Sequence, residues 1–544
     1  MGGTYKMARY DNLDCIIIGY NDIGFQVVEN NLRKMQAYSG TYRQLKTNSV
    51  YFRGVRTPYM DVLNQILKET TGQDRHFHVC ELPSLGVSYL KSFLRKRQFK
   101  VEIINFFNYE KDRLLDLLVQ SPSAVAITTT FYVDNSPIID IINFVRHHSP
   151  QTKIIVGGPH IYNICSGYDS KTQHLNFKRI GADIYVYDSQ GETTLSYILR
   201  ELRNQKKQNF SDIPNLIYTF DNNTFHRTKR MIESNDMDEN SVEWRYFRRE
   251  FYTPTTQTRT ARSCAFKCSF CQYPVVAGPL NFTSLKVVED ELKMFHASGV
   301  KNIIFIDDTF NVPLRRFKEI CRMMIRYKFD FNWFSYFRCS HSDDETFDLM
   351  RDSGCKGVFL GIESGDQTIL NNMNKFAKID KYKYGIHKLK ERGITTFVSI
   401  IVGFPGETEE TLRNTINFLE ESSPAFYRAE LYYYAKKTPI HKHAEKHGLI
   451  GEGYSWKHNS MDWKVASNMV ELMYKTIRGS VVLPSYMFYF WAIPYLMGKG
   501  ISLEQITGFT SIAQEMLVQS FNNDKIPETS EQERRLASIF RKSS

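Results

Sequence analysis

The sequence predicts an α/β protein with a doubly wound, Rossmann-like parallel sheet, then a partial TIM-type (β/α)6 barrel, then a helical C-terminal part. Between residues 82 and 192, short apolar runs alternate with stretches of helical periodicity, which is typical of parallel sheets covered by helices. The same alternation resumes between 286 and 403. From residue 464 onward the periodicity is helical.

Composition sets the limits of this prediction. A chain of 544 residues is too long for one core, and 42% hydrophobic residues exclude a disordered protein. The net charge of +11 is spread along the chain without a nucleic-acid motif, so we expect no nucleic-acid partner. Nine cysteines and no apolar leader indicate reduced thiols and a cytoplasmic location. The apolar run 481–497 is short and interrupted by prolines, so we expect no stable membrane insertion.

Four segments of the first sheet are candidates for a ligand site. Strands are expected near 13–19, 101–105, 124–130, 153–156 and 183–187. Ligands of such sheets lie at the carboxyl ends of the strands. The candidate residues at these ends and at one helix start are Ser84, Leu85, Gly86, Val87, Thr129, Thr130, Gly157, Gly158, His160, Gln190, Gly191 and Glu192.

The second β/α region also places polar residues after its strands. Strands are expected at 302–306, 331–337, 357–360 and 395–402, with helices at 286–298, 313–327, 343–353 and 378–392. The residues near their C-terminal ends are Asp307, Asp308, Arg338, Glu363, Ser364 and Ser399. Barrels of this kind carry their chemistry at these ends. An Asp pair after a strand is also common as a helix N-cap, and Gly-Phe-Pro-Gly at 403–406 is also common as a turn.

Three cysteines stand between the two regions in a C-x3-C-x2-C spacing: Cys264, Cys268 and Cys271. Three thiolates on one loop can bind three irons of a [4Fe–4S] cluster and leave the fourth iron open to a small molecule. A zinc site is the alternative, but it requires a fourth ligand close by. The next histidine is His296 and the next cysteine Cys321.

This cysteine loop, with Phe270 before its last cysteine, resembles the signature of the radical S-adenosylmethionine (SAM) superfamily. The resemblance implies that SAM chelates the open iron and is cleaved to a 5′-deoxyadenosyl radical. It also implies SAM contacts from Phe270, Tyr273, Asp307, Asp308, Arg338, Glu363, Ser364 and Ser399. In particular, Glu363 and Ser364 match the ribose-contacting positions, and the Arg338 guanidinium can pair with the SAM carboxylate.

The first region resembles the cobalamin-binding domain that precedes the radical SAM core in one subfamily. The twelve candidate residues of the first sheet carry this resemblance, which implies that they bind cobalamin. The segment at 188–192, Asp-Ser-Gln-Gly-Glu, departs from the usual Gly-Glu-Gly-Glu. We also find no Asp-x-His-x-x-Gly motif for a lower axial histidine, since Asp74-Arg75-His76 lacks the glycine. A flavodoxin-like domain with another ligand, or with none, is the alternative.

Together, the two resemblances imply a class B radical SAM methyltransferase. We expect methyl transfer from methylcobalamin to an unactivated carbon of a natural-product or peptide substrate, with flavodoxin or ferredoxin as external electron donor. The alternative is ring formation, rearrangement or oxidation without methyl transfer. A non-catalytic corrinoid or redox sensor would not need the cysteine loop. Methylthiolation of transfer RNA would need three more clustered cysteines, but Cys15, Cys80 and Cys165 are far apart.

We expect three domains. The cobalamin-binding domain with its N-terminal extension covers 1–240, the radical SAM core 241–430, and a mainly helical substrate-binding cap 431–544. The composition changes near 235–255, which places the first boundary. A run of tyrosines at 432–434 opens the cap, and aromatic side chains often form the walls of ligand pockets.

Overall fold

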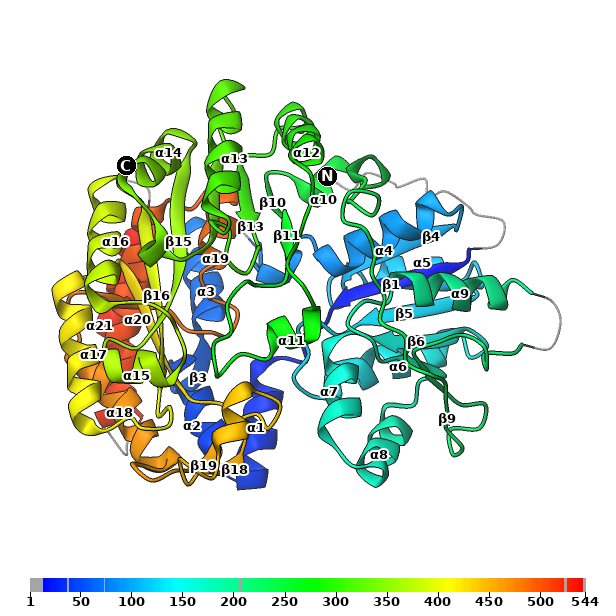
Figure 1. The fold of residues 1–544 in the computed structure, drawn as a ribbon, viewed down its shortest axis with the longest axis horizontal. Helices are drawn as coiled ribbons and strands as arrows, with labels where there is room; N and C mark the ends of the chain where they lie inside the picture. The colour runs from blue at the N-terminus through cyan, green and yellow to red at the C-terminus, as the bar shows by residue number, and fades with distance from the viewer. Residues whose placement is uncertain (1–12, 37–38, 73, 205–207, 523–525, 542–544) are drawn as a thin grey trace. The chain divides into compact units, whose positions relative to one another are not determined.

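The computed structural model describes most of the chain, namely residues 13–36, 39–72, 74–204, 208–522 and 526–541. It divides into two compact units (Figure 1). The first unit holds the residues up to 23 and residues 80–251, and the second holds residues 24–79 and 252–544. Residues 24–79, which we expected to extend the first domain, thus pack with the second unit.

A seven-stranded sheet forms the centre of the first unit, in the order β4-β1-β5-β6-β7-β8-β9. Its strands are β1 (Cys15–Tyr20), β4 (Val101–Phe106), β5 (Ala124–Thr128), β6 (Lys153–Gly157), β7 (Ile184–Val186), β8 (Leu216–Tyr218) and β9 (His226–Arg227). Neighbours from β4 to β7 are parallel, whereas β8 and β9 form an antiparallel edge. All of β1 is buried, which explains its continuous apolar sequence.

Helices pack on both faces of this sheet. One hydrophobic core joins Ile16 and Ile18 of β1 to residues of α5, α6, α7 and α8. Helix α4 packs instead against β1, β4 and α9. The helices are α4 (Leu85–Lys96), α5 (Lys111–Leu118), α6 (Ser136–His148), α7 (Pro159–Gly167), α8 (Ser170–Ile180), α9 (Glu192–Leu202) and α10 (Arg249–Tyr252), with the 3-10 turns η1 (Val79–Glu81) and η2 (Trp244–Tyr246). The predicted doubly wound fold is confirmed.

The second unit contains seven parallel strands in the order β10-β13-β14-β15-β16-β17-β20. They are β10 (Thr255–Thr258), β13 (Asn302–Phe305), β14 (Asn332–Phe337), β15 (Cys355–Glu363), β16 (Thr395–Val402), β17 (Phe426–Leu431) and β20 (Val481–Val482). Strands β10 and β20 lie at the two ends of the sheet, so the barrel is partial, as predicted. Strand β20 comes from an apolar run that we expected to be helical, and it forms because β17 offers it a parallel edge.

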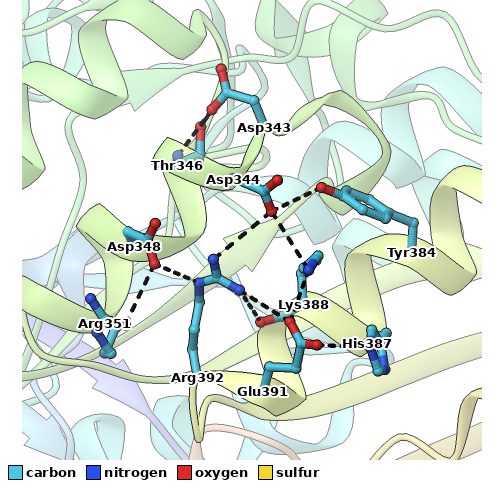
Figure 2. Close-up of polar contacts among 10 residues, drawn as sticks. All are labelled: Asp343, Asp344, Thr346, Asp348, Arg351, Tyr384, His387, Lys388, Glu391 and Arg392. Atoms are coloured by element: carbon cyan, nitrogen blue, oxygen red, sulfur yellow. Dashed lines mark hydrogen bonds and ion pairs between the residues drawn. The ribbon is translucent and has the colours of Figure 1, made fainter.

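Helices connect these strands and lie along the outside of the curved sheet (Figure 1). They are α12 (Leu285–Ser298), α13 (Leu314–Arg326), α14 (Asp344–Asp352), α16 (Ile379–Glu391), α17 (Glu409–Ser422) and α18 (Trp463–Thr476). An ion network joins α14 to α16 around Arg392 (Figure 2). Arg392 Nε lies 2.9 Å from Asp348, and Tyr384 donates to Asp344 over 2.9 Å. The network joins two adjacent β/α repeats of the barrel through their outer helices, α14 and α16.

The N-terminal insertion at 24–79 covers the edge of this sheet. It comprises α1 (Phe25–Gln36), α2 (Gly40–Lys46), β2 (Ser49–Phe52), β3 (Val55–Pro58) and α3 (Tyr59–Thr71). The buried Gln44 side chain accepts the Leu431 N–H over 3.2 Å at the end of β17. The buried Asn48 side chain accepts the Ser485 N–H after β20. These long-range bonds satisfy backbone groups that the end of the sheet would otherwise leave unpaired.

The remaining elements are short or C-terminal. They are β11 (Ala261–Arg262), α11 (Tyr273–Ala277), β12 (Asn281–Phe282), η3 (Cys339–His341), α15 (Gln367–Asn372), η4 (Pro439–His443), β18 (Ile450–Glu452), β19 (Ser455–Lys457), α19 (Ala492–Gly498), α20 (Leu503–Asn522) and α21 (Ser530–Phe540). The C-terminal part is mainly helical but includes the β18–β19 hairpin. Within the described ranges, no helix has the length and apolar character needed to cross a membrane.

Candidate active site

The polar residues that we predicted in the second region lie along one edge of its sheet. Asp307 and Asp308 follow β13, Arg338 follows β14 and Glu363 ends β15. Because these strands are adjacent and parallel, their carboxyl ends lie side by side. Ser399 lies inside β16, opposite Gly361, and is buried. Four neighbouring strands therefore contribute to one candidate site.

The cysteine loop is anchored to two other segments through Ser269. Its N–H donates to the Met373 carbonyl and its hydroxyl to the Asn372 carbonyl, each over 2.9 Å. Its own carbonyl accepts the Ile440 N–H over 2.8 Å. The end of α15 and the turn η4 thus position the loop between Cys268 and Cys271. The anchoring residues carry no sequence motif, so sequence reasoning missed them.

The cysteines themselves suit an iron–sulfur cluster. All three are free thiols, Cys268 is buried, and Cys264 and Cys271 are half-buried. Burial raises the pKa of Cys271 to about 11 and also raises the pKa of Cys268, whereas Lys375 and Arg338 act to lower the latter. Among the described residues, no three acidic, histidine or cysteine side chains converge on one metal ion. A cubane cluster does not need such convergence, because each thiolate binds a different iron.

Arg338 has unused hydrogen-bond donors beside this loop. The residue is 7% exposed, and its guanidinium lies 3.6 Å from the centre of the Phe266 ring. Its Nε and Nη2 atoms are buried and have no acceptor within the described residues. A fixed guanidinium with two free donors is suited to a carboxylate ligand. This geometry agrees with the predicted role of Arg338 towards SAM, which stays a prediction.

Glu363 forms a buried ion pair that the sequence did not reveal. Its Oε1 lies 3.1 Å from Lys375 Nζ, and the two side chains are 11% and 9% exposed. Glu363 has φ 71°, and a Cβ on Gly361 would stand 2.6 Å from the same Oε1. A strained backbone and a glycine without room for a side chain thus fix this carboxylate. Ser364 is buried, and its hydroxyl accepts the Asp366 N–H over 3.1 Å.

The two aspartates after β13 have different surroundings. Both oxygens of the buried Asp307 accept hydrogen bonds, from the Thr260 N–H and hydroxyl at 2.6 Å each and from the Ala261 N–H at 3.0 Å. Asp308 lies beside Tyr273, two residues after Cys271. Burial and the Asp307 charge raise the pKa of Asp308 to about 7, and a hydrogen bond from Tyr273 opposes that rise. Asp307, which follows β13, therefore fixes the backbone of Thr260 and Ala261 just before the cysteine loop.

Three of the predicted segments of the first unit meet at the carboxyl edge of its sheet. The Thr129 hydroxyl donates to the Gly157 carbonyl over 2.9 Å and accepts the His160 N–H over 3.2 Å. A Cβ on Gly158 would stand 2.9 Å from that hydroxyl, and one on Gly86 would stand 3.7 Å from the Thr130 hydroxyl. The segments after β5 and β6 and the start of α4 are therefore in contact.

The Ser84 segment and the 190–192 segment are held by separate bonds. The Ser84 N–H donates to the Asn105 side chain over 2.8 Å, while Leu85 and Val87 are buried. The Gln190 side chain donates to the Glu233 carbonyl over 2.9 Å, and the Glu192 carboxylate accepts the Gly191 N–H. His160 Nε2 lies 2.7 Å from the Asn135 side chain, and burial lowers the pKa of the imidazole. The small glycine and threonine residues of these loops allow a ligand at this edge of the sheet to lie close to the backbone.

Residues 258–419 match the model of the radical SAM superfamily. The match covers the cysteine loop and the strand ends from β13 to β16. These residues therefore form a radical SAM domain. An uncharacterised methyltransferase of Pyrococcus horikoshii is 25% identical over 352 residues, which are 62% of this chain and 73% of that protein. The chain spans less than half the length of four other curated relatives that it matches.

Two solved structures are similar to this chain. One is the radical SAM methyltransferase TsrM from Kitasatospora setae with cobalamin and a [4Fe–4S] cluster, with a TM-score of 0.54 and 20% identity over 67% of this chain and 75% of TsrM. The other is the cobalamin-dependent SAM radical enzyme OxsB with aqua-cobalamin, with a TM-score of 0.58 and 14% identity over 97% of this chain and 83% of OxsB. The fold of this chain is that of these enzymes.

Removal of the Asp307 side chain should disturb the cysteine loop. We expect Asp307→Ala to lower stability by about 3 kcal/mol, because it strands two buried N–H groups and a hydroxyl. Iron content after reconstitution should fall with it, as measured by a colorimetric iron assay. Asp308→Ala is the matched control, because it leaves the Thr260 and Ala261 bonds intact. Equal iron content in the two variants would contradict the positioning role of Asp307.

Glu407 should make stability depend on pH. It is buried, and one of its oxygens accepts the Gly403 N–H while the other has no partner within the described residues. Burial raises the pKa of Glu407 to about 8. Because the folded pKa exceeds the unfolded one, this contribution is complete below about pH 4.5 and is lost as the pH rises through 8.

The matching measurement compares wild type with Glu407→Gln by thermal unfolding between pH 5 and 9. The glutamine imitates the protonated carboxyl group and cannot ionise. We expect the variant to gain on the order of 4 kcal/mol relative to wild type across this range. Parallel pH profiles of the two proteins would show that Glu407 does not titrate as described.

Proposed function

We propose that this chain is a cobalamin-dependent radical SAM methyltransferase. It transfers a methyl group from methylcobalamin to an unactivated carbon of a natural-product or peptide substrate. The observation that carries this proposal is the presence, in one chain, of the Cys264–Cys271 loop in a radical SAM domain and of a doubly wound sheet whose ligand edge is formed by glycine- and threonine-bearing loops. TsrM and OxsB, which have the same fold, support both cofactors.

The residues of the second unit have distinct proposed roles. Cys264, Cys268 and Cys271 hold the cluster, and Arg338 binds the SAM carboxylate with its free donors. Glu363, fixed by Lys375, and Ser364 contact the ribose, and the other SAM contacts are those implied by the sequence resemblance. The bound cluster supplies the electron that cleaves SAM, and an external donor of the flavodoxin or ferredoxin class supplies that electron in turn.

The proposed cobalamin site is the carboxyl edge of the first sheet. Gly86, Gly157 and Gly158 let backbone approach the corrin closely, and Thr129 holds the loops after β5 and β6 together. The bound cobalamin supplies the methyl group. We propose no lower axial histidine from the 74–76 segment, because it lacks the glycine of the usual motif.

Product analysis tests methyl transfer directly. The reconstituted enzyme is given SAM with a deuterated methyl group, a reductant and candidate substrates. We expect a product heavier by one labelled methyl group, with 5′-deoxyadenosine and S-adenosylhomocysteine formed in about equal amounts. This ratio follows because one SAM starts the radical reaction and a second renews the methyl group.

The alternative is a cobalamin-dependent radical enzyme that forms rings, rearranges or oxidises without methyl transfer. It uses the same two cofactors, and OxsB, a cobalamin-dependent SAM radical enzyme, matches 97% of this chain. In that case, product would form with 5′-deoxyadenosine but without S-adenosylhomocysteine, and the mass of the product would show no added methyl group.

A further inference from the structure

Arg428 and Glu430 of β17 face the interior of the barrel. Tyr427, just before Arg428, packs on Tyr474 of α18 with ring centres 5.9 Å apart, and Ala429, between Arg428 and Glu430, is bonded to the Tyr474 hydroxyl. Side chains on a strand alternate between its two faces. Arg428 and Glu430 therefore point away from α18, and the Arg428 guanidinium lies 5.7 Å from the centre of the Phe397 ring.

Aromatic rings fill the barrel one level below Arg428, where Tyr336, Phe359 and Phe397 pair in register. Phe397 stacks on Phe490 with centres 5.6 Å apart, and Phe359 lies 4.7 Å from Phe397. Tyr336 lies 4.9 Å from both Phe359 and Trp491. Tyr336 and Phe359 are half-buried, so these rings retain accessible apolar surface.

Glu430 lies at the same level of the sheet as the candidate active site. It pairs with Ile401 in register, and the preceding residue Ile400 pairs with Glu363. Arg428 is two residues nearer the aromatic rings and pairs with Ser399. Arg428 thus stands between the aromatic rings and the edge that carries Glu363, and Glu430 lies at that edge.

The Arg428 guanidinium has a donor that the protein does not use. Its Nη2 lies 3.1 Å from Glu430 Oε2, but its Nε is buried without an acceptor in the described part of the chain. The two side chains are 14% and 29% exposed. A buried donor on a charged group is costly when it is left without an acceptor, so a ligand that supplies one binds favourably.

We propose that Arg428 and Glu430 bind a substrate with the head group of an amino acid and an apolar side chain. This inference rests on the proposed function and names the substrate class of that site. The Arg428 guanidinium receives the carboxylate, and the Glu430 carboxylate receives the ammonium. The apolar side chain lies on the half-buried rings of Tyr336 and Phe359, where its burial contributes through the hydrophobic effect.

Thermal shift of the reconstituted holoenzyme tests the subsite without turnover. The probes are L-phenylalanine, L-tryptophan and L-leucine, each beside its α-amide and its N-acetyl derivative. We expect at least one free amino acid to raise the melting temperature, because a ligand that binds only the folded state stabilises it. Its amide and its N-acetyl derivative should bind about tenfold to a hundredfold more weakly, since each lacks one charged contact.

Variants assign the effect to the two residues. Arg428→Met should remove the shift in melting temperature. Arg428→Lys keeps the positive charge and should retain part of the shift, which separates loss of binding from misfolding. Glu430→Gln should reduce the preference for the free amino acid over its N-acetyl derivative. The exposed Arg351→Met on α14 is the matched control and should shift like wild type.

Two results would overturn the subsite: no shift with any of the free amino acids, or an undiminished shift in Arg428→Met. Cleavage of SAM by the same wild-type preparation, with dithionite as reductant, is measured in parallel. Normal cleavage with either overturning result means that the subsite is wrong while the proposed function stands. If SAM is not cleaved but the shift depends on Arg428, the subsite is right and the proposed function is wrong.

Discussion

Cys264→Ala should abolish cluster assembly and all cleavage of SAM while leaving cobalamin binding largely intact. The three thiolates of the loop hold three irons, and loss of one leaves a site with too few ligands for a stable cluster. Cys264 lies in the second unit, whereas the proposed cobalamin edge lies in the first. Iron content, 5′-deoxyadenosine formation and the corrinoid spectrum of the variant check the three parts of this expectation.

Cys165→Ala is the matched control for this experiment. Cys165 is a half-buried cysteine of the first unit, outside the cysteine loop. This variant should retain the iron, the cobalamin and the activity of wild type. Wild-type SAM cleavage by Cys264→Ala would refute the assignment of the cluster to the loop.

Lys375→Met should destabilise the second unit by about 3 to 5 kcal/mol, because it leaves the buried Glu363 carboxylate without its partner. Burial alone would lower the pKa of the Lys375 ammonium. The charges of neighbouring groups, of which Glu363 has the largest effect, outweigh burial and raise that pKa. The loss should appear as a lower denaturant midpoint at neutral pH and unchanged denaturant dependence. Affinity for SAM should fall as well, since Glu363 is no longer fixed.

The double variant Lys375→Met with Glu363→Gln separates the two effects. With both charges removed, we expect most of the stability to return. SAM cleavage should stay low, because the carboxylate itself is missing. If the single and double variants were equally unstable, the ion pair would not be the source of the loss.

Local sequence patterns were sufficient to predict most of the fold. The continuous apolar strands β1 and β5 and the amphipathic helices between the strands of the barrel carry periodicity within a single element. The placement of residues 24–79 could not be predicted in this way. It depends on bonds such as Gln44 to Leu431, which join residues far apart in the chain. Strand β20 is equally dependent on its partner, because two residues carry no periodicity.

The candidate site was only partly predictable for the same reason. The cysteine spacing is a local signal, and residues after predicted strands were expected to line one edge, as they do. Lys375 and Arg428 lie in segments without a motif, and their importance comes from burial and from the charge opposite them. The different surroundings of Asp307 and Asp308 depend on which groups fold next to each of them. The sequence shows only two adjacent aspartates, so it cannot distinguish them.

Anaerobic reconstitution of the full chain with iron, sulfide and cobalamin tests the central claim most directly. The readouts are the visible spectrum, the iron content and the corrinoid content. The account predicts about four irons and one cobalamin per chain. Four irons without cobalamin would leave the radical SAM assignment in place but contradict the proposed cobalamin site and, with it, the methyl-transfer function.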